Sequence, residues 1–200
     1  MFDKSDFDVF KDDTLSGRLN LIKQQLDPKF EIFGNKLLDK LEEEYNQKFY
    51  LKIAKHQRRT KNPPSDTWLA INLDKRGYKK TPHLELGLWP DRYFITFSLL
   101  ADAHKREDYY PLIKKWNDQV VSDNWLVSND HTVPEMNTSD SYNDSVKRYS
   151  KVKSSDFVFG FDLLKDSEQV IKGNYDDLLF DKFIELSKFL VDANKEVSEK

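Results

Sequence analysis

Apolar residues recur every three to four positions at both ends of the chain, which is the spacing of amphipathic helices. A first helix is predicted over residues 15–26, with Asp13 or Thr14 as its N-cap. A second is predicted over residues 28–45, because Pro28 suits the first turn of a helix. A long helix closes the chain, and its predicted buried stripe consists of Leu178, Leu179, Phe183, Leu186, Phe189 and Leu190.

The middle of the chain changes to the two-residue alternation that is typical of strands. Pro90 and Asp91 separate two alternating segments, and so short a turn makes its flanking strands antiparallel neighbours. A helix is expected near Pro111, with Trp116 facing inward. The predicted strands span residues 49–53, 68–73, 83–88, 93–100, 125–127 and 157–163.

Residues 128–145 are rich in Ser, Asn and Asp and are predicted to form an exposed loop insert. No flexible linker divides the chain, so residues 1–200 are predicted to form a single domain. Helices come first, then a run of strands, then strands mixed with helices. This order predicts an α+β fold, with a mainly antiparallel sheet covered on one face by amphipathic helices.

Composition narrows the class of protein. The mean hydropathy is −0.76 and 14% of the residues are aromatic, so aromatic side chains must supply much of a lean core. The absence of cysteine excludes disulfides and thiol chemistry. The acidic start, MFDKSDFDVFKDD, is unlike a signal peptide, and no apolar run is long enough to cross a membrane. We therefore expect a soluble cytoplasmic protein; the sequence does not indicate its oligomeric state.

Positive charge is concentrated in one stretch, AKHQRRTKNPPSDTWLAINLDKRGYKKTPHLELG. Between Lys55 and Lys80, eight basic residues stand against two acidic ones, a local net charge of +6 in a chain whose total is −3. A positive patch on an acidic body attracts anions to one place. The acidic body argues against a large nucleic-acid footprint, but a nucleic-acid end remains a candidate ligand.

Alternation gives the predicted sheet two faces. The strands near residues 70 and 85 carry only leucine and isoleucine on one face, which is expected to pack against helices. The other face is polar, and it is either a ligand floor or a solvent-facing surface. Its predicted members are Trp68, Ala70, Asn72, His83, Glu85, Gly87, Thr96, Ser98, Gly160 and Asp162.

Basic residues flank the strand at 68–73, whose ends lie about 20 Å apart at about 3.3 Å per residue. The two basic clusters form one site only if a loop folds back over the sheet. Residues 54–67 are long enough to do so, and their double proline would stiffen them into an arm. Such an arm would place Arg58, Arg59 and Lys61 over His83 and Glu85.

Cationic and aromatic side chains in this stretch fit an anionic ligand. Arginine forks suit bidentate contacts with phosphate or carboxylate, and an aromatic face allows a base to stack. Pairing with acidic helices, or a plain exposed hairpin loop, would explain the same residues without a ligand. The candidate ligand-binding residues are Arg58, Arg59, Lys61, Trp68, Asn72, Arg76, Tyr78 and Lys79.

His56 and His83 are candidates for acid–base chemistry with Glu85 as a partner, because histidine titrates near neutral pH. Both also fit as structural histidines. No metal site is predicted, since cysteine is absent and the four histidines are dispersed. Phosphate-binding loops, dinucleotide fingerprints and nucleophile elbows are absent, so the sequence indicates neither a reaction nor a cofactor.

The segments AKHQRR, NPPSDTWLAI and KRGYKKTPHLELGLW, together with VFGFDLL, resemble the YktB-like family of uncharacterised bacterial proteins. The resemblance is close over residues 53–89 and looser along the rest of the chain. It implies an α+β domain of the broad type found in class II synthetase and biotin-ligase catalytic cores, with a ligand on the sheet face. It implies no activity, and the motifs of those enzymes are absent from the chain.

Three functional hypotheses remain open. The first is binding of an anionic ligand, such as a nucleotide, a phosphometabolite or a nucleic-acid end, on the sheet face under the basic arm. The second is an enzyme that uses His83 or His56 with Glu85 on the same face. The third is an interaction scaffold whose basic loops dock an acidic partner.

Overall fold

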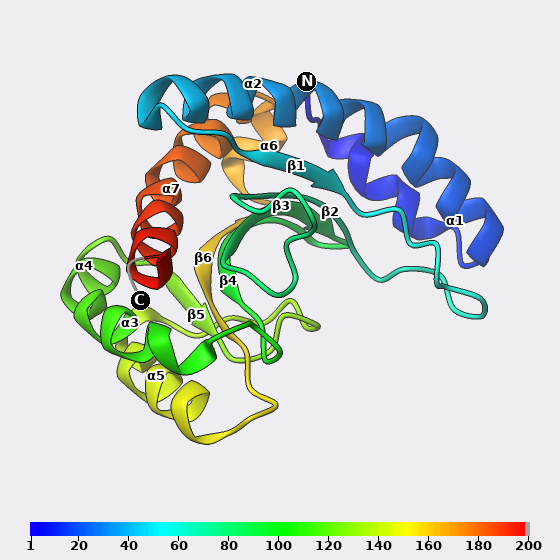
Figure 1. The fold of residues 1–200 in the computed structure, drawn as a ribbon. Helices are drawn as coiled ribbons and strands as arrows, with labels where there is room; N and C mark the ends of the chain where they lie inside the picture. Colours follow the sequence, from blue (N-terminus) through cyan, green and yellow to red (C-terminus); the bar gives the residue numbers. More distant parts are fainter. Residues whose placement is uncertain (199–200) are drawn as a thin grey trace.

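The computed structural model describes residues 1–198, and a single antiparallel sheet forms its centre (Figure 1). Pro90 and Asp91 form the turn between β3 and β4, as predicted. The six strands of the described part are, in spatial order, β1 (Tyr50–Ile53), β2 (Thr67–Asn72), β3 (His83–Trp89), β4 (Arg92–Leu99), β6 (Phe157–Leu164) and β5 (Leu126–Ser128). The predicted α+β class and antiparallel sheet are confirmed.

The long helices lie on one side of this sheet (Figure 1). One of them, α2, packs against β1 and β2, and α7 packs against β3 and β4. The helices of the described part are α1 (Leu15–Leu21), α2 (Asp27–Tyr45), α3 (Tyr110–Lys115), α4 (Asn117–Ser122), α5 (Tyr142–Lys151), α6 (Glu168–Lys172) and α7 (Asp176–Ser198). A π-helical turn, Ile22–Leu26, joins α1 to α2, and 3₁₀ helices span Lys4–Lys11, Arg106–Tyr109 and Ser139–Ser141.

Local sequence explains where the first helices begin. The side chain of Thr14 accepts a hydrogen bond from the backbone N–H of Gly17, so Thr14 is the N-cap of α1. Pro28 lies in the first turn of α2, where its missing N–H costs no hydrogen bond. Both predictions are confirmed, although α1 runs into α2 through the π turn.

Aromatic rings fill the core between the sheet and the helices. Phe97 and Phe159 lie side by side on β4 and β6, with ring centroids 5.1 Å apart. Trp116, which joins α3 to α4, meets Phe97 edge-on at 5.4 Å, and Phe189 of α7 meets Phe159 at 4.9 Å. The predicted inward position of Trp116 is confirmed, and these rings supply the buried area that a lean composition would otherwise lack.

The prediction of an exposed loop over residues 128–145 is wrong in part. Its last residues begin α5, and Tyr142 and Ser145 are buried there. Tyr142, Val146 and Tyr149 follow the helical spacing that turns one face of α5 toward the core. The abundance of Ser, Asn and Asp hid this short stripe, and it also hid the segment before α5, which folds over the sheet.

Two further elements were not predicted. The 3₁₀ helix Lys4–Lys11 buries Phe7 against Tyr93, with ring centroids 4.9 Å apart, and Asp6 accepts a hydrogen bond from the Tyr93 hydroxyl. The short helix α6 also falls in a segment that the sequence left unassigned. None of the helices in the described part is long and apolar enough to cross a membrane.

Gly160 provides a direct test of the sheet register. A Cβ atom at this position would lie 1.9 Å from the backbone oxygen of Ile95, which cannot move without disturbing β4. We expect Gly160→Ala to lower the free energy of unfolding by about 1–3 kcal/mol, measured by urea denaturation. Gly77→Ala is the control, because its Cβ would meet nothing within 4 Å. Equal stability of the two variants would contradict the register.

Candidate functional site

The strand register brings the predicted polar residues onto one face of the sheet, which we call the polar face. Asn72, His83 and Ser98 form one row across β2, β3 and β4. Ala70, Glu85, Thr96 and Gly160 form the next row, and Trp68, Gly87, Phe94 and Asp162 form the third. The predicted membership of this face is therefore confirmed.

The polar face is covered, so the alternative of an open solvent-facing surface is wrong. Asn72 and His83 have no exposed area, and Glu85 is 8% exposed. Three segments meet over or beside this face: residues 54–66, the loop of residues 73–82, and residues 129–138. Each carries residues that contact the face or line a hollow on it.

Tyr78 is the main contact of the loop of residues 73–82. Its hydroxyl accepts a hydrogen bond of 3.0 Å from Nε1 of Trp68. Its ring meets the imidazole of His83 edge-on, with centroids 4.9 Å apart. The side-chain amide of Asn72 donates to the carbonyl oxygen of Gly77 at 2.7 Å, which fixes the loop to β2. The loop after β2, rather than the arm before it, therefore lies over His83.

The arm before β2 is held at both of its ends. The guanidinium of Arg18 in α1 donates to the carbonyl oxygen of Pro64 at 2.8 Å. His56 lies 3.2 Å from the Thr67 hydroxyl and meets the Trp68 ring edge-on at 5.5 Å. The arm therefore contacts the polar face through His56.

The basic residues of the arm point into solvent. Arg58, Arg59 and Lys61 are all exposed, and the position over His83 that the sequence suggested for them belongs to Tyr78. Their part in binding a ligand stays a prediction.

His83 lies against Glu85 and is itself inaccessible. Its Nδ1 atom donates to the carbonyl oxygen of Thr81 at 2.8 Å, which leaves Nε2 facing Glu85. Nε2 lies 3.4 Å from Oε1 of Glu85, an ion-pair distance without hydrogen-bond geometry. Because His83 has no exposed surface, it packs beside Glu85 but cannot touch a substrate in this conformation.

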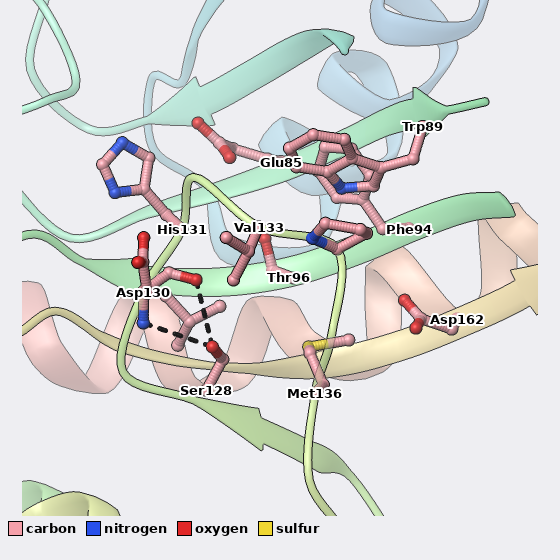
Figure 2. A pocket seen from close by; sticks show the side chains of 12 residues that line it. Glu85, Trp89, Phe94, Thr96, Ser128, Asp130, His131, Val133, Met136 and Asp162 are labelled. Atoms are coloured by element: carbon pink, nitrogen blue, oxygen red, sulfur yellow. Dashed lines mark hydrogen bonds between the residues drawn. The ribbon is translucent and has the colours of Figure 1, made fainter. Parts of the chain in front are cut away.

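A small pocket, which we call the acidic pocket, opens beside Glu85 (Figure 2). Its volume is about 30 Å³, and its walls include Glu85, Asp162, His131 and the rings of Trp89 and Phe94. It lies between the polar face and the segment of residues 129–136, which crosses over the sheet. The sequence pointed to Glu85 and Asp162 but gave no sign of the segment that closes over them.

One carboxylate oxygen of Asp162, in the acidic pocket, lacks a hydrogen-bond partner within the described residues. Its Oδ2 atom accepts a hydrogen bond of 2.8 Å from Arg92, whereas Oδ1 is buried and lacks a hydrogen-bond partner within the described residues. Burial raises the pKa of Asp162 to about 6, although the bond from Arg92 opposes that rise.

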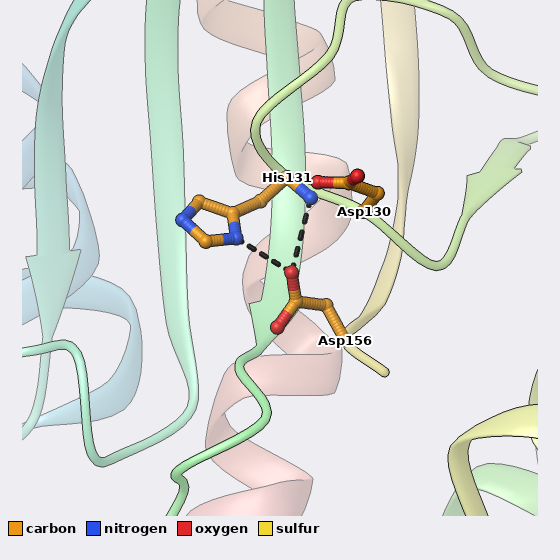
Figure 3. Close-up of side chains that lie close together, drawn as sticks. All are labelled: Asp130, His131 and Asp156. Carbon is orange, nitrogen blue, oxygen red and sulfur yellow. Dashed lines mark hydrogen bonds and ion pairs between the residues drawn. The ribbon is translucent and has the colours of Figure 1, made fainter. Parts of the chain in front are cut away.

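His131 and Asp156 form a hydrogen-bonded pair at the rim of this pocket (Figure 3). Nδ1 of His131 lies 2.6 Å from Oδ2 of Asp156, and its other ring nitrogen points away from the carboxylate. The hydrogen bond to Asp156 raises the pKa of His131. Burial alone would raise the pKa of Asp156, but hydrogen bonds from His131 outweigh it and lower that pKa. A base with an orienting carboxylate can accept a proton.

Asp130, His131 and Asp156 also present oxygen and nitrogen atoms within 4.8 Å of one another. No metal was expected there from the sequence, because His131 stands alone in a polar stretch. In the structure these atoms already bond within the protein: Oδ1 of Asp130 accepts from the backbone and hydroxyl of Thr132. A divalent cation would have to replace these bonds.

Two titratable groups of the arm beside the polar face have shifted pKa values. Burial, and then the neighbouring Glu85, raise the pKa of Asp66 to about 6. Burial lowers the pKa of His56 to about 4, helped by the charges of Arg59 and Lys79. Carboxylates also lie on the polar face itself, so an anion bound directly to that face would be repelled.

A second hollow of about 700 Å³, which we call the basic cleft, lies next to Tyr78. Asp74 is the acidic residue in its wall, and its Oδ1 accepts from the backbone N–H of Arg76. None of the cleft's basic side chains forms an ion pair with any described residue. These side chains are Lys52, Lys55, Arg76, Lys79 and Lys80. Lys55 belongs to the first basic cluster of the sequence, and Arg76, Lys79 and Lys80 belong to the second. The fold therefore brings part of both clusters to one cleft.

Fold and site define a single-domain α+β protein with a covered, acidic sheet face and a basic cleft at its rim. Residues 2–188 match a family described as a domain of unknown function, DUF1054. A UPF0637 protein of Lactiplantibacillus plantarum is 36% identical over 98% of this chain and 92% of its own length. Another, from Latilactobacillus sakei, is 40% identical over 84% of this chain and 85% of its own length. The chain belongs to the DUF1054/UPF0637 family of uncharacterised bacterial proteins.

This membership agrees with the resemblance to YktB-like proteins. The names of the relatives carry no activity over to this chain. The likeness to synthetase and biotin-ligase cores stays a prediction of that resemblance.

The His131–Asp156 pair can be tested by titration. Asp156→Asn should lower the pKa of His131, because the amide no longer stabilises the imidazolium. NMR titration of the imidazole protons measures this shift. The pair should stabilise the fold below the ordinary histidine pKa of about 6.5 and lose that contribution as the pH rises through the raised pKa. Asp130→Asn is the control and should lower the His131 pKa less, because Asp130 contributes only the smallest of the effects that raise it. An unchanged His131 pKa in Asp156→Asn would contradict the pairing.

Proposed function

We propose that the protein binds a small anionic ligand in the basic cleft, at the rim of the polar face. The observation that carries this proposal is the set of five cationic side chains around one hollow, without an ion pair to any described residue. Elsewhere on the surface lysines are often paired, as Lys48 is with Glu42 and Lys172 with Glu168. Unpaired cations that share a cleft lower the free energy of a bound anion together.

We therefore expect the ligand at the rim of the polar face, in the basic cleft, rather than on the face itself. Arg76, Tyr78 and Lys79 line the cleft and keep the ligand-binding role that the sequence suggested. Asn72 is fully buried and holds the loop through Gly77, so its role is to position the loop. Trp68 supports Tyr78 from below through the hydrogen bond between them.

The chemistry of the cleft favours phosphate or carboxylate groups. Arg76 offers a planar fork for two oxygens, and the lysines add mobile point charges. Tyr78 gives a ring that a base could stack on. A nucleotide, a phosphometabolite or a nucleic-acid end would meet these requirements, and their shared feature is a phosphate beside an apolar or aromatic part.

An enzyme on the same face is the second candidate. The pair of His131 and Asp156 next to Glu85 favours it, because it combines a base with its orienting group. His83 would then act through Glu85, and His56 would be a neutral base at physiological pH. A scaffold that docks an acidic partner on Arg58, Arg59 and Lys61 is the third candidate, and it requires no occupied cleft.

Thermal unfolding tests the anion proposal. At low ionic strength, pyrophosphate or ATP should raise the melting temperature, and at 100-fold excess over Kd the stabilisation should be about 2.7 kcal/mol. Added salt should weaken the effect, because it screens exposed charges. The double substitution Arg76→Ala with Lys79→Ala should abolish most of the shift.

The matched control is Lys114→Ala with Lys115→Ala, which removes two exposed positive charges of α3 away from the cleft. Arg58→Ala with Arg59→Ala separates the arm from the cleft: a loss of binding there would move the site to the arm. No shift with any phosphate compound, or equal losses in the cleft and control variants, would reject the proposal.

A further inference from the structure

The two edges of the sheet differ in how their backbone groups are bonded. At the β5 edge, Val127 and Asn137 exchange two backbone hydrogen bonds of 2.8 Å, which close part of that edge. At the opposite edge, β1 pairs with β2 alone among the described segments, and all four of its residues are half-buried rather than covered (Figure 1). Unpaired backbone groups along an edge strand are a template for a further strand.

The register of β1 shows which of its backbone groups are unpaired. The hydrogen bond from the N–H of Ala54 to the carbonyl oxygen of Trp68 continues the pairing of β1 with β2. Backbone bonding alternates along an antiparallel pair, so Lys52 also bonds to β2, whereas the N–H and carbonyl groups of Leu51 and Ile53 point away from the sheet. These outward groups bond to nothing else within the described residues.

A hollow lies on each side of β1. On the helix side, a hollow of about 800 Å³ is lined by β1 and α2. On the other side lies the basic cleft, and Lys52, Ile53 and Lys55 line both hollows. Successive side chains of a strand point to opposite faces, so a strand added to β1 would send alternate side chains into the two hollows.

The two hollows differ in chemistry. The side chains of Leu38, Phe49 and Leu51 give the helix side an apolar wall, and its three lysines are offset by Asp27 and Glu31. The basic cleft has five cationic side chains and one carboxylate. An added strand therefore fits best with apolar residues toward α2 and acidic residues toward the basic cleft.

We infer that β1 binds an extended segment of a partner protein in which acidic and apolar residues alternate. Backbone hydrogen bonds to Leu51 and Ile53 supply affinity, and the two hollows select the side chains. The α2 wall runs from Asp27 to Leu38, about 17 Å at about 1.5 Å per residue, which matches about five extended residues.

Charge and backbone chemistry disfavour two other occupants of this edge. A second copy of the chain would bring the same lysines against Lys52 and Lys55, and like charges across a strand pair repel. A nucleic-acid strand would match the charge, but it cannot continue a β ladder along Leu51 and Ile53. The inference uses two cations of the basic cleft and does not rest on a small anion binding there.

The experiment uses the full chain and a fluorescein-labelled peptide of alternating glutamate and valine, with binding followed by fluorescence polarisation. At tenfold excess over Kd, the peptide should slow hydrogen exchange of the Leu51 and Ile53 amides about tenfold, measured by NMR. ATP should leave both amides unprotected, because an anion in the basic cleft makes no ladder with β1. This readout separates the peptide site from the proposed anion site.

Two kinds of control separate backbone pairing from charge. Methylation of the peptide nitrogens that face β1 should weaken binding about tenfold or more, because it removes donors and keeps the charge. Lys52→Glu should also weaken binding about tenfold, since it places a like charge opposite the acidic residues. Lys114→Glu, an exposed lysine of α3, is the matched control and should bind the peptide normally.

Three results would overturn the inference. The first is equal binding of the methylated and unmethylated peptides, or no protection of the Leu51 and Ile53 amides. The second is protection of these amides without peptide in a chain that sedimentation shows to be a dimer, which would assign the edge to a second copy. The third is stronger binding of a thymidine oligonucleotide than of the peptide, in competition with it, which would assign the surface to nucleic acid.

Discussion

Antiparallel pairing of β2, β3, β4 and β6 in one continuous register is the constraint on which both the core and the candidate site depend. Side chains alternate along every strand, so one register assigns the leucines and phenylalanines to the helices and the polar residues to the opposite face. A slip by one residue would exchange the two sets and bury Glu85 in an apolar core. Gly160, pressed against the backbone of β4, makes such a slip costly.

The polar face becomes a site because loops, rather than helices, cover it. Tyr78 lies on His83, and the segment with His131 crosses beside Glu85. This cover removes water from the carboxylates, which raises the pKa of Asp66 and Asp162. The lysines of the basic cleft lie on the outer side of these loops, where they stay solvated. Burial therefore separates a negative interior from a positive rim, and the rim suits an anionic ligand.

Local patterns predicted much of this arrangement. Two-residue alternation assigned Trp68, Asn72, His83 and Glu85 to one face of the sheet. Helical spacing predicted most of the helices that cover the opposite face. Such patterns do not predict the path of the loops, because that path depends on contacts between residues far apart in the sequence. Arg18 fixes the arm through Pro64 and Asn72 fixes the following loop through Gly77. Local patterns assigned His131 no role, because its partner Asp156 is 25 residues away.

The central claim is that the rim of the covered sheet face carries a cleft that binds anions. Anomalous diffraction from a crystal soaked in sodium bromide tests it directly, because bromide is an anion whose position the anomalous signal reports. The account predicts a bromide peak in the basic cleft near Arg76 and Lys79. Bromide beside the carboxylates of Glu85 and Asp162, or no bromide in the cleft, would contradict it.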